Sequence, residues 1–142
     1  MKKLIFSLVL SLSVILVFGQ NSVNSKNYSS LILGKWKLRE AEGNGADKGF
    51  AMYGDEYFGE TFYKDDGTAS HISLYKTSWK IDKDILTEKM IADNGSPVTA
   101  DIWIKYKISI LDENTLELKV VERHGDTSYR IDGAPRLVYK RD

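Results

Sequence analysis

The chain has no cysteine, two prolines and two histidines among its 142 residues. Without cysteine it forms no disulfide and offers no thiol for a lipid anchor, so burial of side chains has to hold the fold together. The histidines, His71 and His124, lie far apart in the sequence and give no clustered set of metal ligands. The glycine-rich phosphate loops G-x-x-x-x-G-K-[ST] and G-x-G-x-x-G are also missing. We therefore expect no metal site and no cofactor, and the sequence assigns no catalytic residue.

An excess of one charge is missing too. The 20 basic and 20 acidic side chains give a formal net charge of zero, and both signs are interspersed along the chain. A nucleic-acid-binding protein would need a basic patch, so we expect no nucleic-acid partner. The composition and length are those of one ordinary soluble domain, and nothing in them sets the oligomeric state.

The longest apolar run, residues 4–18, follows the basic start Met1, Lys2 and Lys3 and is interrupted only by serines. It is shorter than the roughly 20 apolar residues of a membrane-spanning helix, and no basic flank follows it. We interpret residues 1–19 as a cleavable signal peptide, with a membrane anchor as the alternative. Residues 20–30 are predicted to be a polar linker and 31–142 the folded domain. The mature chain is expected to be secreted or periplasmic, with no membrane span.

Alternating apolar and polar residues, separated by short turn sequences, dominate the rest of the chain, and no stretch has the period of an amphipathic helix. Sequential hairpins without a long crossover favour a meander that closes on itself and so removes its edge strands. We therefore predict an all-β fold, an up-and-down antiparallel β-barrel of about eight strands. The expected strands are residues 34–40, 57–64, 68–75, 78–82, 85–91, 100–111, 115–122 and 136–141.

Four short motifs resemble those of the small bacterial lipocalin-like domains, which belong to the calycin-type barrels. Residues 32–38 match L-x-G-x-W-x-L with Ile32 at the first position, and residues 139–141 match a final Tyr-x-Arg. Residues 62–68 read F-x-x-x-D-G-T, and residues 79–86 read W-x-I-x-x-x-x-L. The order and spacing of the motifs carry the resemblance, which covers residues 31–142. It implies a lipocalin-like barrel.

The tripeptide Gly34-Lys35-Trp36 is interpreted as a structural plug. In a closed meander the first strand pairs with the last, so Trp36 and Arg141 fall at the same end of the barrel. A guanidinium over the indole face would contribute about 0.5–2 kcal/mol and would close that end. Gly34 allows the incoming chain to pass closely beneath the indole.

If Trp36 marks the closed end, a ligand enters from the other end. There the long segment 41–56 is expected to act as a lid through its aromatic residues, while inward-facing side chains of the strands line the interior. These residues have an alternative role as plain filler of a packed core. The candidate ligand-binding residues are Phe50 and Tyr53 on the lid, with Phe58, Glu60, Phe62, Trp79, Ile104 and Tyr106 in the barrel.

The register of the strand at 57–64 leaves two arrangements open. In the first, Phe58, Glu60 and Phe62 face inward and place a carboxylate between two phenyl rings. A slip of one residue would instead turn Tyr57, Thr61 and Tyr63 inward and leave Glu60 in water.

Three functions compete. The leading hypothesis is an exported lipocalin-like protein that holds a small apolar or amphipathic molecule in the barrel. The second is a cell-envelope interaction or accessory domain with a packed barrel and an exposed apolar patch on its outer face. The third is a calycin-like enzyme that uses carboxylates converging at the open end. The proposed patch consists of Tyr57, Tyr63, Tyr75 and Trp103, and the proposed carboxylates are Glu40, Glu60 and Glu122.

Overall fold

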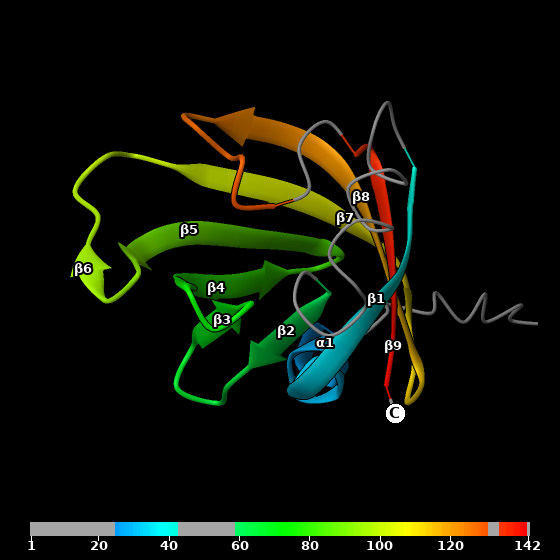
Figure 1. The fold of residues 1–142 in the computed structure, drawn as a ribbon. Coiled ribbons are helices and arrows are strands. Elements are labelled where there is room, and N and C mark those ends of the chain that lie inside the picture. Colours follow the sequence, from blue (N-terminus) through cyan, green and yellow to red (C-terminus); the bar gives the residue numbers. More distant parts are fainter. Residues whose placement is uncertain (1–24, 43–58, 131–133, 142) are drawn as a thin grey trace, which may run out of the picture.

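A computed structural model describes residues 25–42, 59–130 and 134–141 of the chain. The strands of the ring follow one another as antiparallel neighbours, and the pairing of β1 with β9 closes the sheet into a barrel of eight strands (Figure 1). The two-residue strand β6 pairs only with β5 and lies outside this ring. The elements are α1 (Ser25–Leu31), β1 (Gly34–Glu42), β2 (Glu60–Tyr63), β3 (Thr68–His71), β4 (Tyr75–Asp82), β5 (Ile85–Asp93), β6 (Ser96–Pro97), β7 (Trp103–Leu111), β8 (Thr115–His124) and β9 (Arg136–Lys140).

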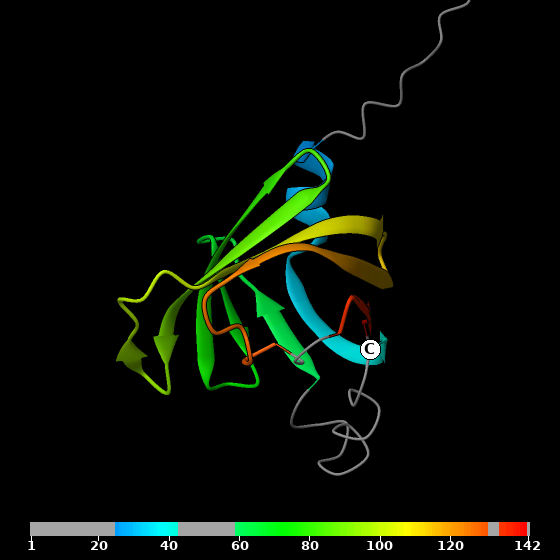
Figure 2. The same ribbon diagram turned by 90° about the horizontal axis from the view of Figure 1, so that it is seen from above.

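The prediction of an all-β, up-and-down antiparallel barrel is confirmed, and the architecture is consistent with a calycin or lipocalin-like fold. The ring is closed where β9 lies between β1 and β8 (Figure 2). Leu38 of β1 and Leu116 of β8 both pair with Tyr139 of β9, and a bulge between Leu38 and Glu40 shifts the register of β1. Closure leaves no open edge in the eight-stranded ring, as expected for a barrel.

The pairing register defines the two ends of the barrel. Lys140 pairs with Lys37 of β1 and with Thr115 at the start of β8, so β8 begins at the end that carries Trp36. Strand β8 therefore finishes at His124 at the opposite end. Residues 125–130, which follow β8, leave the sheet at that end, and we call them the inserted segment.

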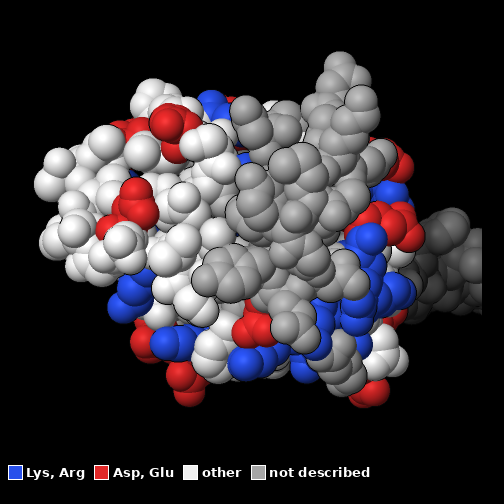
Figure 3. Space-filling model, in the orientation of Figure 1, with Lys and Arg blue, Asp and Glu red and all other residues white. Residues whose placement is uncertain are grey.

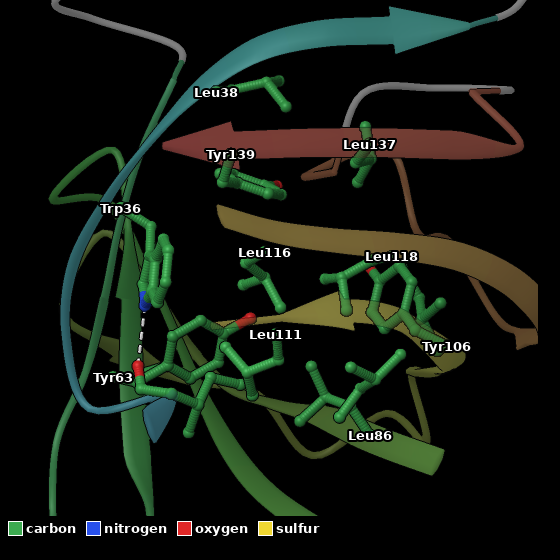
Figure 4. Packing of buried hydrophobic residues seen from close by; sticks show 14 of the residues in the cluster. Trp36, Leu38, Tyr63, Leu86, Tyr106, Leu111, Leu116, Leu118, Leu137 and Tyr139 are labelled. Carbon is green, nitrogen blue, oxygen red and sulfur yellow. Dashed lines mark hydrogen bonds between the residues drawn. The ribbon is translucent and has the colours of Figure 1, made fainter. Parts of the chain in front are cut away.

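The core consists of side chains that point inward from all parts of the ring (Figure 4). Leucines from β7, β8 and β9 interdigitate with tyrosines from β2, β7 and β9, which fills the interior near Trp36. The inward residues follow the period of two, as in Leu86, Glu88 and Met90 of β5. The labelled core residues are Trp36, Leu38, Tyr63, Leu86, Tyr106, Leu111, Leu116, Leu118, Leu137 and Tyr139.

Two local features differ from the prediction. The expected strand at 68–75 ends at His71, because Ile72 and Ser73 adopt positive φ angles of 50° and 62° and turn the chain into β4. Within the expected linker, residues 20–30, lies most of helix α1, and Tyr28 and Leu31 pack against the core. The apolar side chains at these two positions explain why the segment folds onto the barrel.

Basic and acidic side chains lie next to one another on the face shown in Figure 3. Several ion pairs join neighbouring strands there and elsewhere, such as Lys35 with Glu60 at 3.2 Å and Lys105 with Glu122 at 2.8 Å. Their exposure means that each adds little to stability.

Candidate functional site

A charged cluster occupies the interior of the barrel, and its centre is Arg130 of the inserted segment. The residue is only 5% exposed. Gly125 makes the approach of this segment possible, because its φ is +74° and an added Cβ would stand 3.0 Å from the Asp101 carbonyl oxygen. Ser128 N donates to Asp126 Oδ1 at 3.0 Å, and Arg130 N donates to the Thr127 carbonyl at 3.1 Å, so two local hydrogen bonds shape the turn.

The Arg130 guanidinium has five N–H groups, and each has an acceptor inside the barrel. The acceptors come from four different strands, which explains how one side chain links opposite walls. Nε donates to the Tyr106 hydroxyl at 3.0 Å, Nη1 to Thr61 Oγ1 at 3.0 Å and His71 Nδ1 at 2.9 Å, and Nη2 to Glu88 Oε1 at 3.2 Å and the Tyr63 hydroxyl at 3.4 Å. The donor capacity of Arg130 is therefore used up by the protein itself.

Glu88 of β5 is fully buried and supplies the opposite charge. Its Oε1 accepts from Arg130 and also from the Tyr63 hydroxyl at 2.5 Å. Its Oε2 accepts no hydrogen bond from the described residues, and His71 Nε2 lies 3.6 Å from it, beyond hydrogen-bond distance. Burial raises the pKa of the Glu88 carboxyl, and the attraction of Arg130 and the bond from Tyr63 offset part of this rise.

His71 of β3 is the second titratable group of the cluster and is 2% exposed. Burial, followed by the neighbouring Arg130 charge, lowers the pKa of the imidazole well below its ordinary value of 6.5, so the ring is neutral. Because Nδ1 accepts from Arg130, the proton sits on Nε2, which donates to Thr77 Oγ1 at 3.0 Å.

Tyr129 precedes Arg130 and packs its ring against His71 and Tyr75, with centroids 5.8 Å and 5.7 Å apart. The residue is 8% exposed, yet its hydroxyl has no hydrogen-bond partner among the described residues. Burial raises the pKa of this phenol above its ordinary value, so the group is a neutral hydroxyl. The interior thus contains two buried oxygen atoms, Glu88 Oε2 and Tyr129 Oη, with unused hydrogen-bonding capacity.

The candidate residues of β7 face the interior, as predicted. Ile104 and Tyr106 are fully buried, and Tyr106 contacts the charged cluster through its hydroxyl. Trp79 of β4 is partly buried, packs on the core and meets the Tyr63 ring edge-on at 5.8 Å. Its Nε1 donates to the Thr68 carbonyl at 3.0 Å, so the indole is anchored near the turn between β2 and β3.

The inward orientation predicted for Glu60 and Phe62 is wrong. Thr61 and Tyr63 are the buried residues of β2, and Thr61 pairs with the inward-facing Trp36. Both faces of this segment carry apolar residues, so alternation alone did not decide the register. The structure adopts the alternative with Thr61 and Tyr63 inside, and Glu60 pairs with Lys35 at the surface. Some predicted features cannot be compared with the structure, because they lie outside the described residues. They are the signal peptide, the lid at 41–56 beyond Glu42, and the candidate residues Phe50, Tyr53 and Phe58.

The residues interpreted as a plug, Gly34, Trp36 and Arg141, lie together at one end of the barrel. Trp36 is fully buried, and the Arg141 guanidinium carbon lies 4.3 Å from its ring centroid. Arg141 also donates to the carbonyls of Leu31 and Leu33, the latter at 2.9 Å, while Trp36 Nε1 donates to the Ile32 carbonyl at 2.7 Å (Figure 4). Gly34 has a φ of +107°, which explains the glycine.

No protein-family model matches the chain, and no curated protein and no solved structure matches it. Within the described residues no helix is long and apolar enough to cross a membrane, and no three potential metal-ligating side chains cluster together. The function therefore has to be argued from the barrel itself.

The carboxylates suggested for an enzyme do not converge. Glu60 pairs with Lys35, Glu122 pairs with Lys105, and Glu40 pairs with Arg136, each on a different part of the outer surface. The bulge in β1 and the register of β2 turn Glu40 and Glu60 away from the interior, and Glu122 is exposed on β8. A catalytic arrangement built on these three residues is thus wrong.

The outer-face patch is also smaller than expected. Tyr63 is buried and Tyr75 packs against Tyr129, while Tyr57 lies outside the described residues. Trp103 does face outward, where His124 stacks on it at 5.4 Å and Lys105 Nζ lies 4.8 Å from its ring centroid. An open groove of about 600 Å³ adjoins it, lined by Ser78, Trp79, Lys80, Thr87, Lys89, Asp101, Trp103 and Lys105.

His71, Glu88 and Arg130 were not among the residues selected from the sequence. Glu88 could have been found, because it lies between Leu86 and Met90 on the inward face of a clearly alternating strand. His71 shares the buried face of β3 with Ala69, but the strand has only four residues and its alternation is too short to indicate burial of a histidine. Arg130 lies outside any strand, and its neighbours give no local signal for insertion into the barrel.

Proposed function

We propose that the protein binds a small apolar or amphipathic molecule inside its barrel and that it acts as an exported member of the bacterial lipocalin-like group. The observation that carries this proposal is a pair of buried oxygen atoms, Glu88 Oε2 and Tyr129 Oη, that have no hydrogen-bond partner in the described part of the chain. Buried polar groups in folded proteins nearly always have partners. An interior that served only as a packed core would have apolar residues at these positions, since unpaired polar groups destabilise it.

The closed end and the inserted segment support the same proposal. Trp36 and Arg141 close one end, while the inserted segment enters from the other, next to where β1 ends at Glu42. The end opposite Trp36 is thus the place where the chain connects strands by its longer segments, and such segments commonly carry binding sites. The proposal includes no catalytic step.

Intrinsic fluorescence provides the test, because the tryptophans lie on opposite faces of the sheet. Trp36 and Trp79 pack on the interior side, whereas Trp103 faces outward. In the Trp103→Phe variant the tryptophan emission comes from Trp36 and Trp79, and adding Trp79→Phe leaves only the fully buried Trp36, because Trp79 also lines the outer groove. We expect lipophilic molecules to change this emission with a saturable concentration dependence. Native mass spectrometry of protein purified without detergent, followed by organic extraction, should then detect and identify a bound molecule.

A protein that remains free of ligand across growth conditions, together with an unchanged emission of Trp103→Phe, would contradict the proposal. The outward-facing Trp103 groove favours a second candidate, the cell-envelope interaction domain. For that function the emission change would occur in the unmodified protein and disappear in Trp103→Phe.

Export itself is tested by determining the N-terminal residue of the mature protein, which we expect near Gln20.

A further inference from the structure

The buried cluster limits which polar group a ligand can bring into the barrel. Three members of the cluster are already saturated or committed. Arg130 uses all five N–H groups on protein acceptors, and the Nε2 proton of His71 points to Thr77. The Tyr63 hydroxyl donates to Glu88 Oε1. No other donor among the described residues forms a hydrogen bond with Glu88 Oε2.

Glu88 Oε2 is thus a buried acceptor without a hydrogen-bond donor among the described residues. The residue is fully buried on the inward face of β5, where its strand neighbours Trp79 and Ile104 also pack on the core. The neutral hydroxyl of Tyr129 is also unpaired, and its ring lies beside His71, whose Nε2 is 3.6 Å from Glu88 Oε2. The Tyr129 ring and Glu88 Oε2 therefore both lie near the His71 imidazole.

The charge of the ligand's head group also determines how well it fits this site. An anionic head group, such as a carboxylate, would find no free N–H on Arg130 and would face the unpaired oxygen of Glu88. A cationic head group would add a positive charge to a buried site in which Arg130 already balances Glu88. A neutral group with an N–H or O–H donor meets neither penalty.

We propose that the barrel recognises uncharged molecules that carry a hydroxyl or primary amide, with the donor bound to Glu88 Oε2 and the Tyr129 hydroxyl as the second contact. This inference rests on the proposed function. The charges of Glu88 and Arg130 balance each other, and one carboxylate oxygen of Glu88 remains as a hydrogen-bond acceptor for the ligand. We therefore expect the barrel to bind fatty-acid anions more weakly than neutral donors.

The test compares four ligands with the same aliphatic chain: decan-1-ol and decanamide, which donate, and methyl decanoate and decanoate, which only accept. Binding is followed by the interior tryptophan emission of the Trp103→Phe protein. A hydrogen bond to a charged acceptor gives about ten- to hundredfold in affinity. We expect the alcohol and the amide to bind tighter than the ester and the anion by about that factor.

Two variants decide whether Glu88 causes the preference. In Glu88→Gln the amide oxygen keeps the bonds from Tyr63 and Arg130, and the NH₂ replaces Oε2, so the ester should bind at least as tightly as the alcohol. Tyr129→Phe removes the second contact and loses no hydrogen bond within the described residues. In this variant the alcohol should bind several-fold more weakly, while the ester is unaffected.

The outcomes separate the two proposals. Equal binding of all four compounds would overturn the donor preference and leave ligand binding supported, with water satisfying Glu88. No binding of any compound would overturn both proposals. An unchanged preference in Glu88→Gln, or in Tyr129→Phe where Glu88→Gln does not fold, would also overturn the inference.

Discussion

Arg130 donates to Glu88 at 3.2 Å inside the barrel, although 42 positions separate the two residues in the sequence. Strand β5 carries the carboxylate and the inserted segment carries the guanidinium, so this pair joins the segment to the wall of the barrel. Removing one member of a buried ion pair leaves an uncompensated charge, whereas replacing both with apolar residues is often neutral.

Arg130→Met should lower the free energy of unfolding by about 3–5 kcal/mol, because it leaves Glu88 buried without its cation. The double variant Glu88→Leu/Arg130→Met should recover a large part of this loss. Arg123→Met is the matched control, since within the described residues Arg123 donates one hydrogen bond, to the Ala134 carbonyl, and its effect should be about 1 kcal/mol. Urea denaturation measures all three, and equal losses for Arg130→Met and Arg123→Met would refute the assigned role.

Two buried tyrosines allow a comparison of the same substitution. Tyr63→Phe removes the 2.5 Å hydrogen bond to Glu88 and should cost about 1.5–3 kcal/mol, as expected for a bond to a charged group. Tyr129→Phe removes a hydroxyl with no partner in the described structure and should leave stability unchanged or raise it slightly. Thermal unfolding of both variants checks the difference, and a larger loss for Tyr129→Phe would show that its hydroxyl is satisfied.

The stability of the protein should depend on pH through His71. Its pKa in the folded state is lowered by burial and by Arg130, so below pH 6.5 the unfolded state binds more protons than the folded state. The contribution of the neutral ring is thus fully present above pH 6.5 and is lost as the pH falls below it, at up to about 1.4 kcal/mol per pH unit.

His71→Gln isolates this effect, because glutamine can accept from Arg130 and donate to Thr77 but does not titrate. Burial raises the pKa of Glu88, so its contribution has the opposite sign: it is present below pH 4.5 and lost as the pH rises through the folded pKa. Glu88 is present in both proteins, and the comparison therefore reports on His71. We expect the stability advantage of the unmodified protein to shrink on acidification in urea titrations, and a constant difference would show that His71 does not titrate as described.

The turn between β3 and β4 offers a stabilising change. Ile72 and Ser73 both have positive φ, which suits asparagine and glycine and is unfavourable for a β-branched side chain. Ile72→Asn/Ser73→Gly should raise the free energy of unfolding by about 1–2 kcal/mol. Thermal unfolding measures the change, and a lower midpoint would mean that the contacts of Ile72 outweigh the strain.

The stability that Arg141 contributes to the plug should depend on its planar guanidinium group. Arg141→Lys keeps the charge but loses the fork that reaches the carbonyls of Leu31 and Leu33 and covers the Trp36 ring, so we expect a loss of about 1–2 kcal/mol. Lys140→Arg, at the exposed neighbouring position, is the control and should have almost no effect. Urea denaturation compares the two, and similar values would contradict a specific plug.

The period of two was sufficient to predict most strands and their inward residues. In β7 the alternation of Ile104, Tyr106 and Ile108 is unambiguous, and the structure has these residues inside. In β2 both faces carry apolar or aromatic side chains, and the register follows from pairing with β1 and β3, which is tertiary information. Helix α1 is short and rich in serine and asparagine, and its position depends on packing of Tyr28 and Leu31.

The charged cluster was the least predictable part. His71, Glu88 and Arg130 come from separate segments and are brought into contact only when the barrel closes. Their spacing in the sequence does not indicate these contacts. Composition suggested an apolar interior, because charged residues are rarely buried unless they are paired. The plug was more accessible to sequence reasoning, since closure of a meander alone brings Trp36 and Arg141 to one end.

The order in which the ribosome makes the strands has a consequence for this barrel. Strand β9 is the last strand of the ring and separates β1 from β8, so a nascent chain has two unpaired edges until its five residues emerge. Glu88 is synthesised well before Arg130, and its carboxylate has to remain hydrated until the guanidinium arrives. Expulsion of water from the interior is therefore a late, post-synthetic event, and a nascent chain that stalls before Arg130 presents both edges to aggregation.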